Sequence, residues 1–402
     1  MELAGIVGKP NVGKSTMFAA MTLAPVEIAG YPFTTIKPNR GVTYLRIECV
    51  CKELGVKDNP KNSKCIDGAR FIPVEVIDCP GIIRKAHEGR GLGLQFLDEI
   101  RQASALIVVA DASGSTDPDG NPTKPGTGDP VEDVRIVEEE LDHWIYGLLS
   151  EDWKRICRVV ESRVSKLEDE IARKFSGLRI GEKLIQDVLH GLGLDSGKPS
   201  RWSEEQIFSF VRELRKASKP IIVAANKIDI PEAEDGVKRL KEAGYAVVPV
   251  SAEAERILRL AAERGLIRYL PGDRDFEILD DSKLTSNQRR ALELIREKVL
   301  RRWGSTGVQE TVNKAYFEVL RYVPVYPVED HEKLTDRHGN VLPDVYILPE
   351  GSTPRDLAYA VHTDLGKTFL YAIDARRKIR LGENYKLKWG DIISIVSAGK
   401  RG

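Results

Sequence analysis

A glycine-rich run near the start of the chain has the composition and spacing of a phosphate-binding loop. The run reads Gly8-Lys9-Pro10-Asn11-Val12-Gly13-Lys14-Ser15, and Thr16 follows it directly. An apolar stretch, Leu3 to Val7, precedes it, and an apolar helical pattern over residues 16–21 comes after it. Glycines allow the backbone to curl so that its N–H groups point at phosphate oxygens, next to the positive end of a helix dipole. The run therefore predicts a loop that binds the phosphates of a nucleoside triphosphate.

Single side chains in and near this loop have separate predicted roles. We expect Lys14 to reach the β- and γ-phosphates during catalysis and Ser15 to bind Mg²⁺. Asp78 ends the apolar stretch Val74 to Ile77, and it is predicted to hold Mg²⁺ through a water molecule. The N–H of Gly81 would sense the γ-phosphate, so that hydrolysis breaks the contact that orders this segment.

Two further motifs predict that the base of the nucleotide is guanine. Asn226-Lys227-Ile228-Asp229 follows the apolar stretch 221–225, and Ser251-Ala252-Glu253 follows the stretch 246–250. The Asp229 carboxylate can accept hydrogen bonds from the N1–H and the exocyclic amine of guanine, whereas adenine would leave it unpaired at a high cost. We expect Asn226 to contact the base edge and the phosphate loop, Lys227 to lie across the ring, and the Ala252 N–H to meet the guanine carbonyl. The predicted ligands are GTP and GDP.

The candidate catalytic residues include a threonine but lack the glutamine that many GTPases have. A threonine is needed to complete the metal shell, and residues 31–36 offer Thr35, our choice as metal ligand and catalytic residue, with Thr34 as the alternative. Residue 82 is Ile82, where many GTPases have a glutamine that orients the attacking water. Because isoleucine cannot orient water, we expect slow intrinsic turnover unless a partner or a K⁺ ion near Asn11 supplies charge.

Composition limits the class of protein. The chain has 402 residues and a formal net charge of +0, so that net charge indicates no particular partner. A core strand begins almost at the N-terminus, and no charged leader or long apolar segment is seen, from which we expect a cytoplasmic protein without membrane association. The five cysteines suit a reducing compartment better than a disulfide framework.

Three of the cysteines form a second candidate site. Cys49, Cys51 and Cys65, together with Cys79 or His87, could supply ligands for a soft metal ion. Their spacing matches no familiar zinc pattern, and a loop that carries reduced thiols is the favoured interpretation. His87 itself is expected to be a solvent-facing loop residue, with a role in positioning water as the alternative.

The periodicity of apolar residues predicts an α/β fold. We expect a doubly wound P-loop NTPase sheet over residues 1–112 and 219–275, interrupted by a helical, coiled-coil-like insertion over residues 113–218. Turn-forming residues 113–130 mark the start of the insertion. Its apolar positions predict one helix around Val134 to Leu148 and a second, long helix from Ile156 to Leu178. A helical connector over residues 276–322 and a small α+β domain over residues 323–402 complete the chain.

Helix caps locate three further helices. Ser203 with Gln206, and Thr285 with Gln288, have the spacing of capping boxes. The helix that follows Thr285 is expected to end at Gly304. A threonine followed by a proline at residues 353–354 predicts the start of a helix in the last domain.

The assembled motifs resemble the Obg-related translation-factor GTPases, and especially the YchF-like members of the archaeal type. The resemblance rests on the phosphate loop, on the stretch 31–41 (Tyr-Pro-Phe-Thr-Thr-Ile-Lys-Pro-Asn-Arg-Gly), on the turn 78–81 (Asp-Cys-Pro-Gly) and on the stretch 89–96 (Gly-Arg-Gly-Leu-Gly-Leu-Gln-Phe). Residues 348–354 together with Trp389-Gly390-Asp391 are similar to the TGS domain, a β-grasp module.

The resemblance implies a GTPase that acts near ribosomes, with the ribosome or another RNA–protein complex as its partner. It also implies a hydrophobic replacement of the catalytic glutamine and frequent stimulation by K⁺. Bacterial and eukaryotic YchF proteins alter the base-reading motif and can prefer ATP, whereas this chain retains Asn226, Lys227 and Asp229. We therefore predict guanine specificity. An ATP-preferring enzyme and an RNA-binding adaptor with a structural nucleotide stay open as alternatives, and so does the oligomeric state, for which a monomer is favoured.

Overall fold

The computed structural model describes residues 3–23, 40–88 and 95–398. The described residues fall into two compact units. The first unit contains residues 3–23, 40–41, 75–88 and 95–311, and the second contains residues 42–74 and 312–398. Thr34 and Thr35, the candidate metal ligands, lie outside the described residues.

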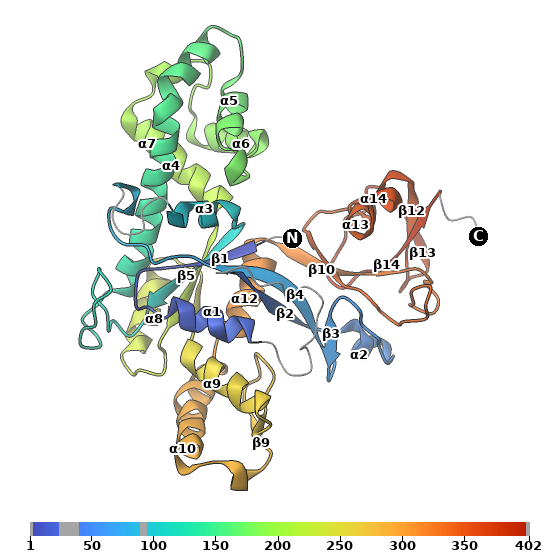
Figure 1. The fold of residues 1–402 in the computed structure, drawn as a ribbon. Helices are drawn as coiled ribbons and strands as arrows, with labels where there is room; N and C mark the ends of the chain where they lie inside the picture. The colour runs from blue at the N-terminus through green and yellow to red at the C-terminus, as the bar shows by residue number, and fades with distance from the viewer. Residues whose placement is uncertain (1–2, 24–39, 89–94, 399–402) are drawn as a thin grey trace. The chain divides into compact units, whose positions relative to one another are not determined.

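The first unit is organised around a sheet whose central strands are parallel (Figure 1). Its strands are β1 (Leu3–Val7), β2 (Arg40–Glu48), β4 (Ala69–Asp78), β5 (Ala105–Asp111), β6 (Ile221–Asn226) and β7 (Val247–Pro249), in the order β2-β4-β1-β5-β6-β7. Residues 42–48 of β2 and 69–74 of β4 are counted with the second unit. β1 pairs in parallel with β4 and β5, and β6 pairs in parallel with β5 and β7. Every residue of β1 and β5 is buried, as expected for the interior of a sheet covered on both faces. The carboxyl ends of these strands therefore share one edge.

Four helices of the first unit accompany this sheet. They are α1 (Lys14–Thr22), α3 (Gln95–Gln102), α8 (Ala233–Glu242) and α9 (Ala252–Glu263), with a short 3₁₀ turn, η2 (Ala86–Glu88), before α3. α1 and α9 pack against each other, and α8 packs on β6 and β7. A small antiparallel pair, β8 (Ile267–Arg268) and β9 (Glu277–Ile278), follows α9. The predicted α/β class is confirmed.

The predicted helical insertion is present, but its second helix differs from the prediction. Its helices are α4 (Pro130–Glu161), α5 (Leu167–Lys174), α6 (Glu182–Leu192) and α7 (Glu204–Ser218), with 3₁₀ turns η3 (Ser176–Leu178) and η4 (Pro199–Arg201), and Figure 1 shows them gathered together. The expected continuous helix from Ile156 to Leu178 is wrong. Arg163 adopts a left-handed φ of 60°, which ends the helix, and Val164 is 77% exposed instead of lying in an apolar seam.

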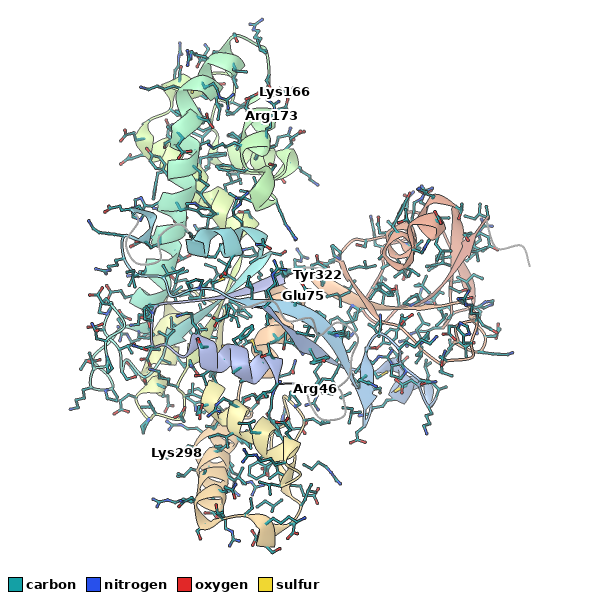
Figure 2. The ribbon with its side chains drawn as sticks, in the orientation of Figure 1. Arg46, Glu75, Lys166, Arg173, Lys298 and Tyr322 are labelled. Carbon is teal, nitrogen blue, oxygen red and sulfur yellow. The ribbon has the colours of Figure 1, made fainter. Side chains whose placement is uncertain are left out.

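Polar contacts fasten the two sides of this break. The carboxylate of Glu170 on α5 is buried and accepts hydrogen bonds from Arg155 on α4 and from Arg173, which is labelled in Figure 2. The capping box of Ser203 and Gln206 is confirmed at the start of α7. The insertion is thus a cluster of packed helices.

The connector begins in the first unit with the predicted capping box of Thr285 and Gln288. It contains η5 (Asp281–Lys283), α10 (Ser286–Ile295), a π-helical turn η6 (Arg296–Leu300) and α11 (Arg301–Trp303). Gly304, with a φ of 84°, ends α11 as predicted. Among the described residues, no helix combines the length and the apolar character needed to cross a membrane.

The second unit is built on a five-stranded sheet with the order β11-β10-β14-β12-β13. Its elements are α2 (Val50–Leu54), β3 (Lys64–Ile66), α12 (Val308–Lys314, of which residues 312–314 belong here), η7 (Ala315–Val319), β10 (Tyr322–Val328), β11 (Tyr346–Pro349), α13 (Pro354–Val361), α14 (Thr363–Lys367), β12 (Phe369–Asp374), β13 (Ile379–Leu381) and β14 (Ile392–Ser397). Leu357 on α13 is buried in one core with Val325, Ala372 and Ile393 from the sheet. The predicted cap of α13 by Thr353, with Pro354 at its first position, is confirmed.

Candidate nucleotide-binding site

The phosphate loop has a backbone that only glycine fits at two positions. Gly8 has a φ of 150°, and a Cβ there would lie 2.4 Å from the carbonyl oxygen of Val109. Gly13 has a φ of 97°, and a Cβ there would lie 2.3 Å from Nδ2 of Asn226. Both distances are far below van der Waals contact, so the curl between β1 and α1 depends on both glycines. Backbone N–H groups at the start of α1 thereby gather where an anion would bind.

Lys14 sits in this loop as a buried ammonium. Its Nζ donates a hydrogen bond to the carbonyl oxygen of Lys9 at 2.7 Å. Burial lowers the pKa of Lys14 to about 8, although the nearby carboxylate of Asp78 opposes the shift. A polyphosphate at this position would favour the charged form, because it adds negative charge beside the ammonium.

The residues present fit a divalent cation. The hydroxyl of Ser15 donates to Oδ2 of Asp78 at 3.3 Å, which places two of the predicted Mg²⁺-binding side chains together. In the described part of the chain, Oδ1 of Asp78 is buried and has no hydrogen-bond partner. Burial raises the pKa of Asp78 while Lys14 opposes the rise. An oxygen of this kind matches the hard oxygen ligands that Mg²⁺ takes.

The segment after Asp78 lies against the phosphate loop. A Cβ on Gly81 would be 3.3 Å from Nζ of Lys14 and 3.2 Å from Cγ of Pro10, so Gly81 is beside the residues predicted to meet the phosphates. The N–H of Ile82 donates to the carbonyl oxygen of Gly8 at 3.0 Å. The Ile82 side chain is fully buried in the apolar core. It therefore contributes to packing and offers nothing to orient water.

Asn226 connects the base-reading motif to the phosphate loop. Its Nδ2 donates to the carbonyl oxygen of Val12 at 2.8 Å, and its Oδ1 accepts from the N–H of Ala252 at 3.1 Å. Asp229 is exposed, and its Oδ1 accepts from the hydroxyl of Ser251 at 2.9 Å. One buried amide thus joins the loops after β1, β6 and β7, and the carboxylate that is predicted to select guanine is held beside them.

The other predicted contact residues lie at the edges of this group. Thr16 is half-buried on α1, whereas Asn11 is exposed and has a positive φ of 61°. Glu253 is exposed at the start of α9 and is bonded to Arg256, so its side chain faces solvent. The structure therefore brings the described candidate residues together at the carboxyl edge of the sheet, where ligands bind in open α/β folds.

Lys227 makes contacts that the sequence analysis did not predict. With a φ of 70°, it extends its Nζ to Oδ2 of Asp111 at 2.9 Å and to the hydroxyl of Ser115 at 3.0 Å. Burial would raise the pKa of Asp111, but hydrogen bonds from Ser113 and Lys227 outweigh it and lower the pKa. Asp111 ends β5 at the same sheet edge as Asp78 and Asn226. Its position at the end of an apolar strand is the feature of the sequence that could have identified it as a residue of this site.

The turn-rich segment 113–129 covers the phosphate loop, although its sequence indicated only a boundary. Nζ of Lys9 donates to the carbonyl oxygens of Thr116 at 3.2 Å and Asp117 at 2.7 Å, and it pairs with Asp133 at 2.6 Å. Nδ2 of Asn11 donates to the carbonyl oxygen of Gly120 at 2.9 Å. Sequence reasoning missed these contacts because backbone carbonyls in a loop carry no residue-type signal.

His87 was expected to be a solvent-facing loop residue, but its side chain is only 23% exposed and is hydrogen-bonded. Nδ1 of the His87 ring lies 2.6 Å from Oε2 of Glu140, and the backbone N–H of His87 donates to the same oxygen at 3.0 Å. The N–H of Lys85 donates to Oε1 of Glu140 at 2.5 Å. The His87 ring also stacks on His143 with centroids 4.7 Å apart. Glu140 and His143 are both on α4, so the first helix of the insertion holds the segment that follows Gly81.

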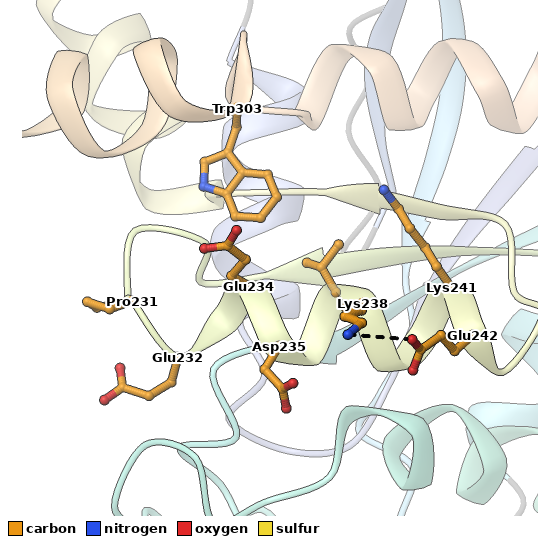
Figure 3. A pocket seen from close by; sticks show the side chains of 9 residues that line it. Pro231, Glu232, Glu234, Asp235, Lys238, Lys241, Glu242 and Trp303 are labelled. Carbon is orange, nitrogen blue, oxygen red and sulfur yellow. Dashed lines mark ion pairs between the residues drawn. The ribbon is translucent and has the colours of Figure 1, made fainter.

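A separate depression lies on α8 and is shown in Figure 3. Trp303 and charged side chains of α8 line it, including Glu234, Asp235 and the ion pair of Lys238 with Glu242. It contains none of the predicted nucleotide-binding residues. Its charged groups are spread along one helix and do not converge, so the phosphate loop remains the candidate site.

Three family profiles match successive parts of the chain. Residues 3–146 match the 50S ribosome-binding GTPase family, residues 224–330 match the Obg-like GTPase YGR210-like, G4 motif-containing domain, and residues 335–397 match the TGS domain. These ranges include the phosphate loop, the Asn226 motif and the sheet of the second unit.

Two related proteins and one solved structure agree with these matches. The chain is 52% identical over 405 residues to an uncharacterized GTP-binding protein of Methanocaldococcus jannaschii, with 100% of each covered. It is 34% identical to the ribosome-binding ATPase YchF of Bacillus subtilis over 69% of this chain and 70% of that protein. The crystal structure of a GTP binding protein from Pyrococcus horikoshii superposes with a TM-score of 0.80 at 43% identity, covering 99% of this chain and 100% of that chain.

Proposed function

This chain belongs to the Obg-like GTPases that carry a C-terminal TGS domain, and on that basis we propose that it is a GTP-hydrolysing switch that acts with the ribosome or another RNA–protein complex. Its family membership implies binding of a guanine nucleotide and hydrolysis of a nucleoside triphosphate. The switch cycle, its partner, its cations and its rate are the parts that we propose.

The observation that carries the proposal is the bridge made by Asn226. Its amide joins the carbonyl oxygen of Val12 in the phosphate loop to the N–H of Ala252, while Asp229 is bonded to Ser251. Binding of the phosphates and reading of the base therefore depend on one connected set of hydrogen bonds. An adenine would leave the Asp229 carboxylate without the two donors that guanine offers, which favours GTP over ATP.

The proposed hydrolysis depends on positioning and on charge. Lys14, beside Gly81, would bind the β- and γ-phosphates and stabilise negative charge as the terminal phosphoryl group leaves. Ser15 and Asp78 would hold Mg²⁺, which when bound supplies charge neutralisation at the phosphates, and Thr35 is the proposed third ligand. Because Ile82 is buried, no side chain at that position activates water, and slow intrinsic turnover is expected.

Guanine selection is tested by titration calorimetry with GTP, GDP and ATP on the wild type and on Asp229→Asn. We expect the wild type to prefer the guanine nucleotides. The amide of Asp229→Asn offers a donor where xanthine has a carbonyl, so this variant should lose GTP affinity and gain affinity for XTP. Asp235→Asn is the matched control, because Asp235 is an exposed carboxylate on α8 outside the motif. Equal ATP and GTP affinity in the wild type would overturn the assignment and favour the ATP-preferring alternative.

The proposed ribosomal partner is based on the name of a relative and on a family match. The Bacillus subtilis protein that is 34% identical to this chain is named a ribosome-binding ATPase. Residues 3–146 of this chain match a ribosome-binding GTPase family. Co-sedimentation with ribosomes in GDP and in a nonhydrolysable GTP analogue tests the switch. Stronger sedimentation in one nucleotide state supports it, whereas equal sedimentation in both favours the adaptor with a structural nucleotide.

A K⁺ ion is the proposed source of the charge that a glutamine-free site needs. Nδ2 of Asn11 donates a hydrogen bond to the carbonyl oxygen of Gly120, so the amide oxygen of Asn11 is the side-chain atom that a monovalent cation would bind. We expect GTP hydrolysis to be faster in K⁺ than in Na⁺ at equal ionic strength, and Asn11→Ala to remove the difference. Equal rates of the wild type in the two salts would remove this part of the proposal and leave GTP binding untouched.

A further inference from the structure

Three thiols and one carboxylate converge in the second unit, outside the nucleotide site. Sγ of Cys49, Cys51 and Cys65 and a carboxylate oxygen of Asp58 all lie within 4.8 Å of one another. Cys49 immediately precedes α2, Cys51 is on α2, Asp58 is in the following loop and Cys65 is on β3. Residues distant by up to 16 positions are thus brought together by the turn of α2 and the β3–β4 hairpin.

The separation between the sulfurs of Cys51 and Cys65 matches that of two ligands on a tetrahedral ion of the zinc class. With Zn–S bonds of about 2.3 Å, two sulfurs on a tetrahedron lie about 3.8 Å apart. Sγ of Cys51 and Sγ of Cys65 are 3.8 Å apart, and Sγ of Cys49 is 3.2 Å from Oδ2 of Asp58. A disulfide would need sulfurs about 2.05 Å apart, and it would not require a carboxylate oxygen within 4.8 Å of all three sulfurs, as is found here.

We propose that Cys49, Cys51, Asp58 and Cys65 bind one divalent ion of the zinc class in a closed, structural site. Four protein ligands leave no open position, which distinguishes a structural site from a catalytic one. The sequence analysis offered Cys79 or His87 as a further ligand but favoured a loop of reduced thiols, whereas in the structure Asp58 is the fourth group of the cluster. Cys79 is buried in the core of the first unit, and His87 is bonded to Glu140.

A buried arginine supports the proposed site from outside. Arg70 is fully buried, and its guanidinium bonds to Oδ2 of Asp58 at 2.7 Å and to the hydroxyl of Ser63 at 2.8 Å. It lies opposite Cys65 in the β3–β4 pairing. Three thiolates and one carboxylate exceed the charge of a divalent ion by two, and Arg70 offsets one of these charges. Partners that orient and neutralise the ligands are characteristic of metal sites.

The same loop anchors a later part of the second unit. The N–H of Asn59 donates to the carbonyl oxygen of Val341 at 2.8 Å, and the N–H of Lys61 donates to that of Pro343 at 2.7 Å. Arg70 itself donates to the carbonyl oxygen of Leu342 at 2.7 Å. An ion that fixes Asp58 therefore holds the loop on which residues 341–343 are hydrogen-bonded. The inferred role is to stabilise this contact within the second unit.

The test begins with the metal content of the full-length protein, purified without chelator and measured by inductively coupled plasma mass spectrometry. We expect close to one zinc per chain in the wild type and in Cys157→Ser, whose buried thiol lies on α4 away from the cluster. Cys65→Ser should retain less than about a tenth of that amount. In addition, chelator-treated wild type titrated with Co²⁺ should show thiolate-to-cobalt charge transfer and tetrahedral d–d bands that saturate at one ion per chain.

The Co²⁺ titration uses the wild-type chain, so it decides the question even where Cys65→Ser fails to fold. Hydrogen exchange should also rise at the backbone amides of Asn59 and Lys61, which donate to the carbonyl oxygens of Val341 and Pro343, on chelation and fall again with Zn²⁺. Absence of zinc together with absence of Co²⁺ bands would overturn the proposal. So would a Cys51–Cys65 disulfide in the intact mass, or full zinc content in folded Cys65→Ser. GTP titration on the same samples reports separately on the nucleotide site.

Discussion

The carboxylate of Glu140 joins the helical insertion to the segment after Gly81 through several hydrogen bonds. It is 5% exposed on α4 and accepts hydrogen bonds from the N–H of Lys85, the N–H of His87 and the His87 ring. The three donors now share two carboxylate oxygens, whereas Glu140→Gln would leave them only one oxygen as an acceptor. The side-chain NH₂ of glutamine would also face an N–H of the segment.

The expected cost follows from these contacts. A hydrogen bond to a charged group contributes about 1.5–3 kcal/mol, and at least one of the three is lost in Glu140→Gln. We expect the segment to open about 2–3 kcal/mol more easily, which is about a 30- to 150-fold larger open population. The whole domain should remain folded, because the apolar core of α4 is unchanged.

Native-state hydrogen exchange measures this opening directly. The amides of Lys85 and His87 should exchange about 30- to 150-fold faster in Glu140→Gln. Glu139→Gln is the matched control, because Glu139 is exposed on the same helix and should leave exchange unchanged. Exchange at both amides within about threefold of the wild type would refute the reasoning, since it would show that the three bonds contribute little.

Three further predictions concern the two units separately. Burial lowers the pKa of Lys14 to about 8, so nucleotide binding should take up a proton above that pH. As the pH rises further, nucleotide affinity should fall by up to about tenfold per pH unit. A pH-independent affinity, measured by calorimetry between about pH 7.5 and 9.5, would contradict this expectation. Asn226→Ala leaves the phosphate loop without its buried donor and should weaken GTP binding by about 2 kcal/mol or more, about 30-fold, whereas an unchanged dissociation constant would show that the bridge is dispensable. Although burial opposes the shift, hydrogen bonds from Lys61 and Asn340 hold the pKa of Asp336 well below its usual range. Its contribution to stability is therefore complete above about pH 4 and is lost as the pH falls further, so the difference in urea stability between wild type and Asp336→Asn should shrink in acid; a constant difference would refute the assignment.

Much of the nucleotide site could be predicted because its chemistry requires particular residue types at short spacing. The curl at Gly8 and Gly13 needs glycine for steric reasons, and the predicted position of Asn226 after a strand places it at the same edge as the loop. The bond from Asn226 to the phosphate loop was predicted and is present. Helix caps were also predictable, since a capping side chain bonds only two or three residues along the chain.

The expected long helix failed for a reason that periodicity cannot reveal. Ile156 and Leu178 lie on a repeating apolar pattern, but a repeat of this kind is equally compatible with two helices separated by a turn. The left-handed Arg163 and the exposed Val164 show that the chain turns there, and the packing of α5 on α4 makes the turn favourable. The prediction of one continuous helix weighed the pattern and had no information on packing.

The amino-acid sequence by itself indicated the chemistry of this chain, because each motif is local: Gly13 and Lys14 are neighbours in the phosphate loop, and Asn226 to Asp229 form the base-reading motif within four residues. Only the tertiary structure decided which distant groups meet. Asp58 joins three thiols, and Glu140 receives His87, because the folded chain brings together residues whose separation along the sequence carries no signal. Contacts of that kind depend on the packing of whole elements, and no short stretch of sequence encodes them.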